Sequence, residues 1–365
     1  MSKRNAYPEI LRCIFCIMIV IHHAGLLGES GASLLPSAGV IADAFFMMSG
    51  YYTCRHILKH MDEIEEPFRY SLKYTLSKIR KVLPYTSFGI IIIYFLDFIH
   101  LESFSLSALT DMICNMAVEL LLLPMTGIMK TDLLNYRNAP LWYLSAMMIA
   151  LPFVMYMAIR LKKTFSLCIV FVLPIINQLY MLKTFGGVLP WMDNLGLFCS
   201  GVIRGFSSLC MGFGVCYLAA LLQDKQSLYG KSARIMLTAL EVLLLISIVV
   251  FARIGVHGFG ELGVIYLIWL MLIITFSGLS YTSEIKFNNI SAISMLTLPI
   301  YCIHWGIYRY VAAYLGFLPL VVGIILTLVL CIITAYILVR VWGYIVGSRF
   351  LRKDRQVNYA TGQKL

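Results

Sequence analysis

Long apolar runs dominate this chain of 365 residues and limit what it can fold into. Charged residues make up 13% of the chain and hydrophobic residues 60%, against about 25% and 45–50% in soluble domains. Inside a bilayer every backbone polar group must be satisfied within the protein, which a helix achieves by itself. The sequence therefore predicts an all-α polytopic membrane protein and excludes a soluble globular fold. Runs of about membrane-spanning length give about ten expected transmembrane helices, at about 8–28, 37–54, 84–101, 140–160, 164–182, 196–222, 233–253, 260–281, 290–316 and 318–346.

The distribution of Lys and Arg predicts the orientation of these helices. With a cytoplasmic N-terminus, the inward-facing segments hold most of the 29 Lys and Arg residues. The outward-facing segments hold only Lys130, Arg137, Lys183 and Arg253. Because cytoplasmic loops are enriched in Lys and Arg, we expect both termini in the cytoplasm. The formal charge of +11 is then explained by the Lys and Arg residues of the cytoplasmic segments, and we expect no nucleic-acid partner.

The chain is expected to form one transmembrane domain over residues 1–346, followed by a short basic cytoplasmic tail at 347–365. Residues 55–83 read as one long cytoplasmic loop of mixed charge, made of a short amphipathic helix, a bend at Pro67 and a basic run into the third apolar run. Residues 104–124 read as an amphipathic stretch that lies in the membrane interface or dips partway into the membrane. His56 and His60 fall in this charged loop without a third ligand nearby, so we expect them to be solvated and predict no metal site.

The first apolar run carries ionisable residues, which are costly in a membrane and so mark candidate functional positions. Arg12 and His23 are eleven residues apart, which is about three helical turns and roughly 16 Å along the axis. Both side chains therefore project from one stripe of the helix, with the cation near the inner surface and the imidazole in the outer half.

Asp43 in the second run is expected at a depth similar to that of His23, because a short loop makes the two runs antiparallel neighbours. A carboxylate that orients an imidazole is the arrangement used in general-base catalysis. A buried His–Asp pair that only fixes helix packing explains the same spacing. His304, in the ninth run, is a third buried imidazole, and a packing role is the simpler interpretation of its position.

Lys78 and Lys81 belong to a basic run that precedes Pro84. Such a run can anchor the helix to anionic lipid headgroups. Two cations one helical turn apart can also bind a polyphosphate. Spacing alone favours the lipid anchor.

These residues resemble the signatures of the acyltransferase 3 family of bacterial integral membrane proteins. The opening signature of that family, an acidic residue, an Arg and a His after ten intervening residues, is similar to Glu9, Arg12 and His23. Four more strings follow in order: the segment 43–52 (DAFFMMSGYY) resembles D-x-FF-x-x-SG-aromatic, 78–84 resembles R-x-x-R-x-x-P with lysine at both arginine positions, 140–144 (PLWYL) resembles P-L-W-[FY]-L, and 301–304 (YCIH) resembles Y-L-I-H.

The resemblance implies an O-acyltransferase of the bacterial cytoplasmic membrane, most simply an O-acetyltransferase. It implies a cytoplasmic acyl-CoA donor such as acetyl-CoA, with no permanently bound cofactor, and a hydroxyl of a cell-surface or lipid-linked saccharide as acceptor. Arg12, Lys78 and Lys81 would then bind the donor. His23, oriented by Asp43, would act as general base or form a transient acyl-histidine, and His304 would position the acceptor or stabilise the oxyanion.

Two other classes of function remain open on the sequence. A transporter or flippase for a lipid-linked saccharide could use the same buried ions as a proton relay, although such proteins usually show repeat symmetry that this sequence lacks. A structural partner of a polysaccharide synthase is the third possibility. The sequence leaves the acyl chain, the acceptor glycan and the oligomeric state undetermined.

Overall fold

The computed structural model describes residues 6–32, 34–100, 105–127, 137–225, 227 and 229–346. These residues form helices joined by short turns and contain no strand, only one isolated bridge between Asn194 and Cys199. The predicted all-α fold is confirmed. The main helices are α1 (Tyr7–His22), α3 (Ile41–His60), α4 (Pro67–Ile99), α5 (Leu106–Leu120), α6 (Trp142–Leu167), α7 (Leu173–Phe185), α8 (Ser200–Asp224), α9 (Lys231–Ile254), α10 (Phe259–Ser277), α12 (Thr297–Leu315) and α13 (Leu320–Val346).

Among the described residues, eight helical segments are long and apolar enough to cross a membrane. The second predicted run, residues 37–54, corresponds to α3. This segment is helical, but it is not one of the eight helices that are apolar enough to cross a membrane. Its polar residues lower its hydropathy, and they are tolerated because most of α3 is buried inside the protein. The fifth predicted run has no loop before it, since α6 continues through a π-helical turn (Cys168–Val172) into α7, and the apolar helix Ile169–Phe185 is short.

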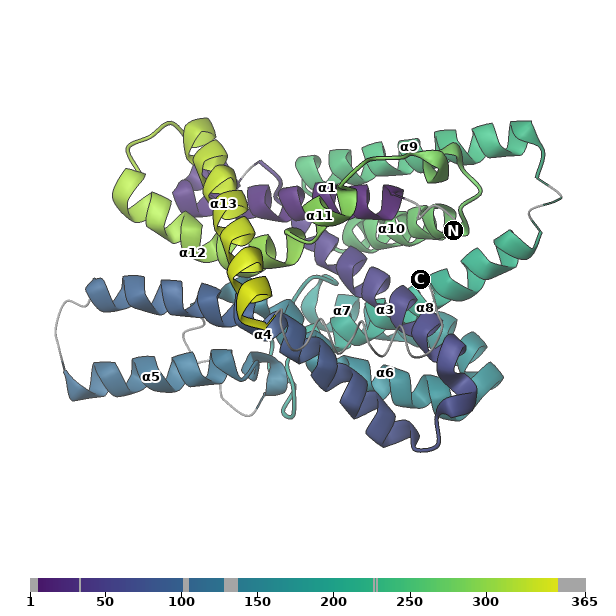
Figure 1. Cartoon of the computed structure of the whole chain (residues 1–365), viewed down its shortest axis with the longest axis horizontal. Helices are drawn as coiled ribbons and strands as arrows, with labels where there is room; N and C mark the ends of the chain where they lie inside the picture. The colour runs from purple at the N-terminus through teal and green to yellow at the C-terminus, as the bar shows by residue number, and fades with distance from the viewer. Residues whose placement is uncertain are drawn as a thin grey trace.

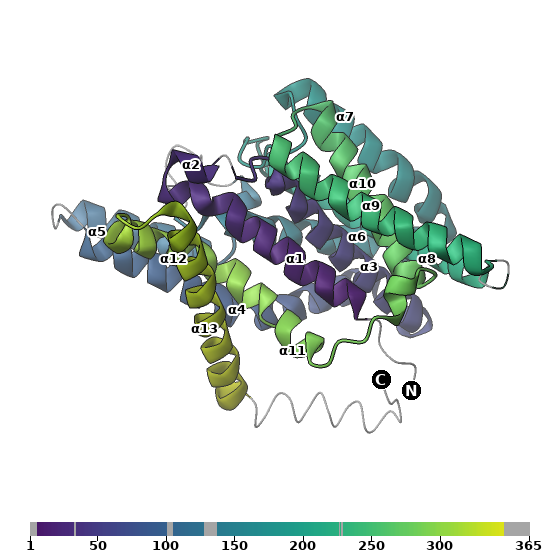
Figure 2. The same cartoon turned by 90° about the horizontal axis from the view of Figure 1, so that it is seen from above.

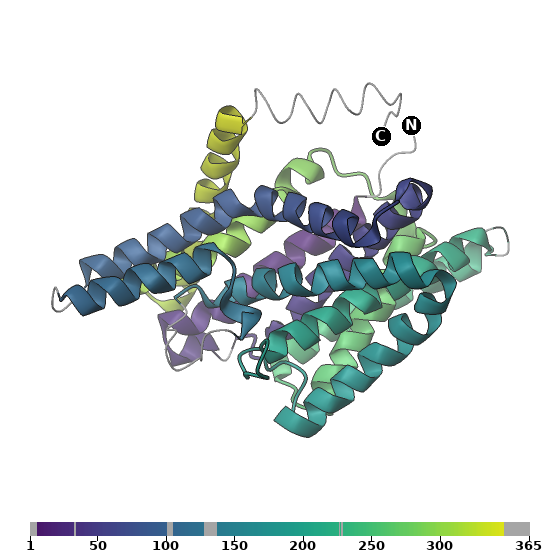
Figure 3. The ribbon, with the colours of Figure 1, turned by 90° about the horizontal axis from the view of Figure 1, so that it is seen from below.

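The segment 55–83 is more helical than expected, and the break between its helices ends at Pro67, where the bend was predicted. α3 continues to His60, and α4 begins at Pro67 and runs without interruption through Pro84 to Ile99. The second half of α4 lies alongside α5, the amphipathic stretch predicted at 104–124 (Figures 1 and 3). A continuous α4 places its basic residues on a rigid helix, where their spacing defines one face.

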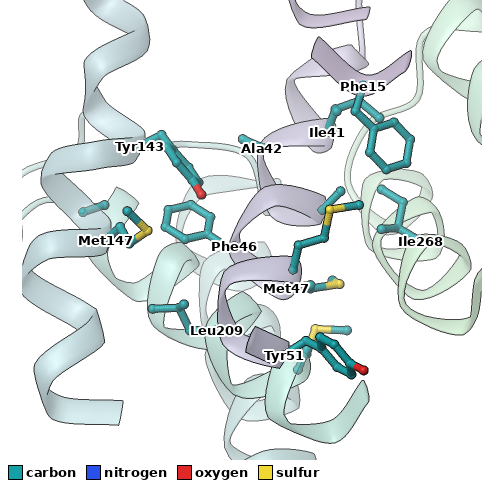
Figure 4. Close-up of a cluster of buried hydrophobic side chains, with 14 of the residues drawn as sticks. Phe15, Ile41, Ala42, Phe46, Met47, Tyr51, Tyr143, Met147, Leu209 and Ile268 are labelled. Atoms are coloured by element: carbon teal, nitrogen blue, oxygen red, sulfur yellow. The ribbon is translucent and has the colours of Figure 1, made fainter. Parts of the chain in front are cut away.

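α1 runs between α12 and α13 on one side and α9 and α10 on the other (Figure 2). It ends at His22, and His23 begins a short 3₁₀ turn, η1 (His23–Leu27). Phe15 of α1 and Ile268 of α10 pack against α3, and Phe46 of α3 packs on the other side against Tyr143 of α6 (Figure 4). α3 is therefore the helix around which the core is built.

α3 and α8 cross at two glycines. A Cβ atom at Gly50 would collide with the carbonyl oxygen of Leu209, and one at Gly212 would collide with the carbonyl oxygen of Met47. The two backbones thus touch directly, as small residues allow in membrane helix packing. The crossing fixes the rotation of α3 and hence the directions in which its polar side chains point.

Gly50→Ala is expected to destabilise the protein, because the added methyl group meets backbone on the facing helix and cannot be absorbed by a side-chain rotation. Overpacked cores lose on the order of 3 kcal/mol. The measurement is the thermal unfolding of the purified protein in detergent. Gly263→Ala, also within a helix but with no atom near its Cβ position, is the matched control. Equal unfolding temperatures for the two variants would contradict the crossing.

Candidate active site

His23 and His304 meet in the structure, although 281 positions separate them in the sequence. His304 Nε2 lies 3.0 Å from His23 Nδ1, and the ring centroids are 5.0 Å apart. His304 is fully buried on α12, while His23 is half-buried at the start of η1. The two imidazoles therefore form one unit between α1 and α12.

The partners of these rings determine which nitrogen carries the proton. His304 Nδ1 lies 2.8 Å from the carbonyl oxygen of Tyr301, which can only accept, so His304 Nδ1 is the donor. In a neutral ring His304 Nε2 then accepts, and His23 Nδ1 must donate to it. The remaining nitrogen of His23, Nε2, keeps its lone pair. His304 thus fixes His23 in the tautomer that presents a basic and nucleophilic nitrogen.

Asp43 does not orient His23, and this part of the sequence prediction is wrong. The carboxylate of Asp43 accepts a hydrogen bond of 2.7 Å from Arg204 Nη2, a second from Arg204 Nε at 3.1 Å, and one of 2.7 Å from the hydroxyl of Ser208. Asp43 is fully buried and Arg204 is 4% exposed. The short loop between the first two runs set the depth of Asp43, but the packing of α3 on α8 pairs this side chain with Arg204 and Ser208.

Arg204 joins three separate parts of the chain. Besides Asp43, it donates to the carbonyl oxygens of Gly39 at 2.6 Å and Leu189 at 2.8 Å. Its guanidinium also lies 4.9 Å from the ring centroid of Trp142. The sequence signal for this pair was available, because an arginine inside an apolar run requires a buried acid. Asp43 therefore has a structural role, holding α3, α8 and two loops together.

A cavity of about 770 Å³ contains all three residues predicted to bind the donor, Arg12, Lys78 and Lys81. Among the described residues that line it, four are basic and none is acidic, the fourth cation being Lys73. Arg12 also pairs with Glu9, 3.0 Å away. The structure thus brings the three predicted residues together in one basic cavity. Their shared cavity is better support for a common binding site than their spacing in the sequence.

Sequence reasoning missed the aromatic side chains of this cavity. Tyr70, Tyr74, Lys78 and Lys81 recur at helical spacing and form one face of α4. His56, expected to be solvated, lies in the same wall, 2.8 Å from the hydroxyl of Tyr70. The helical period along 70–81 was the available signal, but this segment was interpreted only as a basic run into the third apolar run.

His56 lies beyond the predicted membrane run 37–54, and its surroundings disfavour its charged form. Burial lowers the pKa of His56 to about 4, and His60, Lys78 and Lys59 act in the same direction. His56 is therefore neutral at pH 7. It adds a hydrogen-bonding group to the cavity wall without adding charge.

The other end of the cavity is formed by Phe45, Tyr143 and Tyr301. Tyr301 precedes His304 by about one turn of α12, and their ring centroids are 5.8 Å apart. The described residues that line the cavity do not include His23 or His304. The basic cavity therefore ends one aromatic layer away from the histidine pair.

The comparison with known proteins gives one result that fits this geometry. The family model of the Acyl_transf_3 acyltransferase domain matches residues 5–340, nearly the whole chain. This chain belongs to the acyltransferase 3 family. No curated protein sequence and no solved structure gives a significant match. The resemblance inferred from the sequence is confirmed, and the protein is a multi-pass membrane acyltransferase.

The second family-like string, residues 43–52, is explained by this acyltransferase fold. Asp43 and Gly50 both face α8. Asp43 binds Arg204, and Gly50 forms the helix crossing. Phe45, Ser49 and Tyr52 face the cavity. One face of α3 thus holds the bundle together and the other lines the cavity, as expected for residues at helical spacing.

Proposed function

We propose that this protein is an O-acyltransferase, most simply an O-acetyltransferase, that moves an acyl group from cytoplasmic acyl-CoA to a hydroxyl of a cell-surface or lipid-linked saccharide. The observation that supports it is the basic cavity, whose aromatic end lies about one helical turn from the His23–His304 pair. A cavity of this kind suits a long, anionic donor, and the family supplies the acyl-transfer chemistry.

The donor end of the cavity would face the cytoplasm, in line with the distribution of Lys and Arg in the sequence. Lys78, Lys81 and Arg12 would bind the phosphates of acyl-CoA. Lysines bind phosphate as point charges and lack the planar, bidentate geometry of arginine, so we expect several lysines to share the phosphates. The apolar lining residues Met48, Leu144 and Met147 would pack against the pantetheine arm.

The histidine pair would carry out the transfer. His23 Nε2 would accept the proton of the acceptor hydroxyl as its oxygen attacks the thioester carbonyl carbon. The tetrahedral intermediate then collapses, the C–S bond breaks, and the departing thiolate takes the proton from the imidazolium. In the covalent variant, His23 Nε2 attacks the carbonyl carbon and the C–S bond breaks to release the CoA thiolate. The acceptor oxygen then attacks the acyl-imidazolium, the C–N bond breaks, and the hydroxyl proton passes to the thiolate. Both routes need the tautomer that His304 imposes.

Donor binding tests this proposal directly. The double variant Lys78→Gln/Lys81→Gln is expected to bind acetyl-CoA about 100-fold more weakly than the wild type, because a hydrogen bond to a charged group contributes on the order of 1.5 kcal/mol. The measurement is calorimetric titration of the purified protein in nanodiscs with acetyl-CoA.

Arg80→Gln provides the matched control, since Arg80 lies on the same helix, is exposed, and is not among the residues that line the cavity. We expect it to bind acetyl-CoA as the wild type does. Failure of the wild type to bind acetyl-CoA, or equal weakening by Arg80→Gln, would overturn the proposed donor site.

A further inference from the structure

The rings of Phe45, Tyr143 and Tyr301 are packed against one another at the end of the cavity. The Phe45 ring centroid lies 6.4 Å from that of Tyr143 and 6.4 Å from that of Tyr301, and the two tyrosine rings are 5.6 Å apart. Rings at these separations are in van der Waals contact. We call these three side chains the aromatic layer. The layer lies between residues of the basic cavity and the histidine pair, since Tyr301 lines the cavity and its ring centroid is 5.8 Å from that of His304.

Two of the three rings are held in place by the surrounding structure. The hydroxyl of Tyr301 donates to the carbonyl oxygen of Pro140 at 2.5 Å. Tyr143 packs against Phe46, with ring centroids 4.3 Å apart (Figure 4), and its hydroxyl lies 3.4 Å from that of Ser49. Phe45 has no polar group and is only half-buried. Phe45 is therefore the member of the layer that is most easily displaced or replaced.

We infer that the aromatic layer is the acyl-size filter of this enzyme and that it admits acetyl in preference to longer acyl chains. This inference rests on the proposed donor site. A thioester bound with its phosphates at Lys78 and Lys81 would extend its acyl group toward the layer, and the acyl carbonyl must come within reach of His23. A short acyl group needs only a small displacement of Phe45. Each additional methylene needs volume that the three rings already occupy.

The layer also explains how a passage across the membrane can stay closed. The basic cavity and the histidine pair would be reached from opposite sides of the bilayer, so a permanently open connection would let water and ions cross. Apolar constrictions close such passages by excluding water. A closed layer that yields to the thioester meets both requirements.

Phe45→Ala tests the filter. The wild type is expected to bind hexanoyl-CoA at least tenfold more weakly than acetyl-CoA. In the variant this ratio should fall by tenfold or more, because each methylene that finds a buried apolar site strengthens binding by about fourfold. Acetyl-CoA itself should bind the variant within a few-fold of the wild type. The measurement is calorimetric titration of both proteins in nanodiscs with acetyl-CoA and hexanoyl-CoA.

Phe171→Ala is the matched control, because Phe171 is also half-buried but contacts Trp269, away from the cavity. It should keep the chain-length preference of the wild type. If Phe45→Ala does not fold, Phe45→Leu makes a smaller opening, and we expect it to change the ratio in the same direction. A wild type that binds both thioesters equally, or a folded Phe45 variant with an unchanged ratio, overturns the filter and leaves the donor site standing. A wild type that binds neither thioester overturns the donor site and the filter together.

Discussion

His23→Ala is expected to lower acyl transfer by roughly 10³- to 10⁴-fold, the largest effect on activity of any single substitution, because it removes the proposed general base. Binding of acetyl-CoA should survive, since His23 does not line the basic cavity. The measurement is mass spectrometry of the surface saccharides of cells that carry either form, with the amount of membrane protein checked in parallel. We expect the acyl esters to disappear while saccharide export continues.

His304→Ala separates the contribution of the tautomer from that of the base. Without the contact at 3.0 Å between the two rings, His23 can exchange its protonated nitrogen, so we expect a partial loss of about 10- to 100-fold. His100→Ala, which removes a histidine bonded to the carbonyl oxygen of Leu96, should leave the acyl esters unchanged. Lost export with normal acylation in His23→Ala cells would favour a transporter instead, and unchanged acylation would remove His23 from the mechanism.

The second large effect is on stability. Asp43→Asn and Arg204→Met are each expected to destabilise the protein by about 3–5 kcal/mol, because each leaves one member of a buried ion pair without its counter-charge. The double variant Asp43→Leu/Arg204→Met should recover much of this loss, since apolar residues can replace a buried ion pair at little cost. The measurement is thermal unfolding of all four proteins in detergent.

These variants also distinguish the observed role of Asp43 from the one expected on the sequence. If Asp43 oriented His23, Asp43→Asn would lower activity while leaving the unfolding temperature unchanged, and Arg204→Met would not reproduce its effect. The observed contacts of the carboxylate with Arg204 and Ser208 predict the opposite pattern, in which both single variants unfold early and the double variant is more stable than either.

The sequence was a good guide to which ionisable side chains gather inside the protein. Arg12, Lys78 and Lys81 were selected on three segments of sequence, and they line one cavity. His23 was selected as the imidazole of the first span that shares a helical stripe with Arg12, and it lies next to His304. These residues lie together because an ionisable side chain in an apolar run must face the protein interior or a water-filled space.

The partner of each buried group could not be predicted in the same way. Asp43 and His23 come from sequential helices, and chain connectivity sets their depth but not the rotation of each helix about its axis. That rotation is decided at the crossing of Gly50 with Gly212, where two backbones touch. The crossing turns Asp43 toward Arg204, a residue 161 positions away.

The amino-acid sequence by itself determined that this chain is a bundle of membrane helices, that it belongs with membrane acyltransferases, and which polar side chains must point inward. Those properties follow from the cost of placing backbone and charge in lipid, which is a local cost and can be read from residue types and spacing. Only the tertiary structure decided that His304, not Asp43, contacts His23, and that three aromatic rings from different helices pack together beside the cavity. Contacts between distant helices depend on how their surfaces pack together, and no local pattern records that.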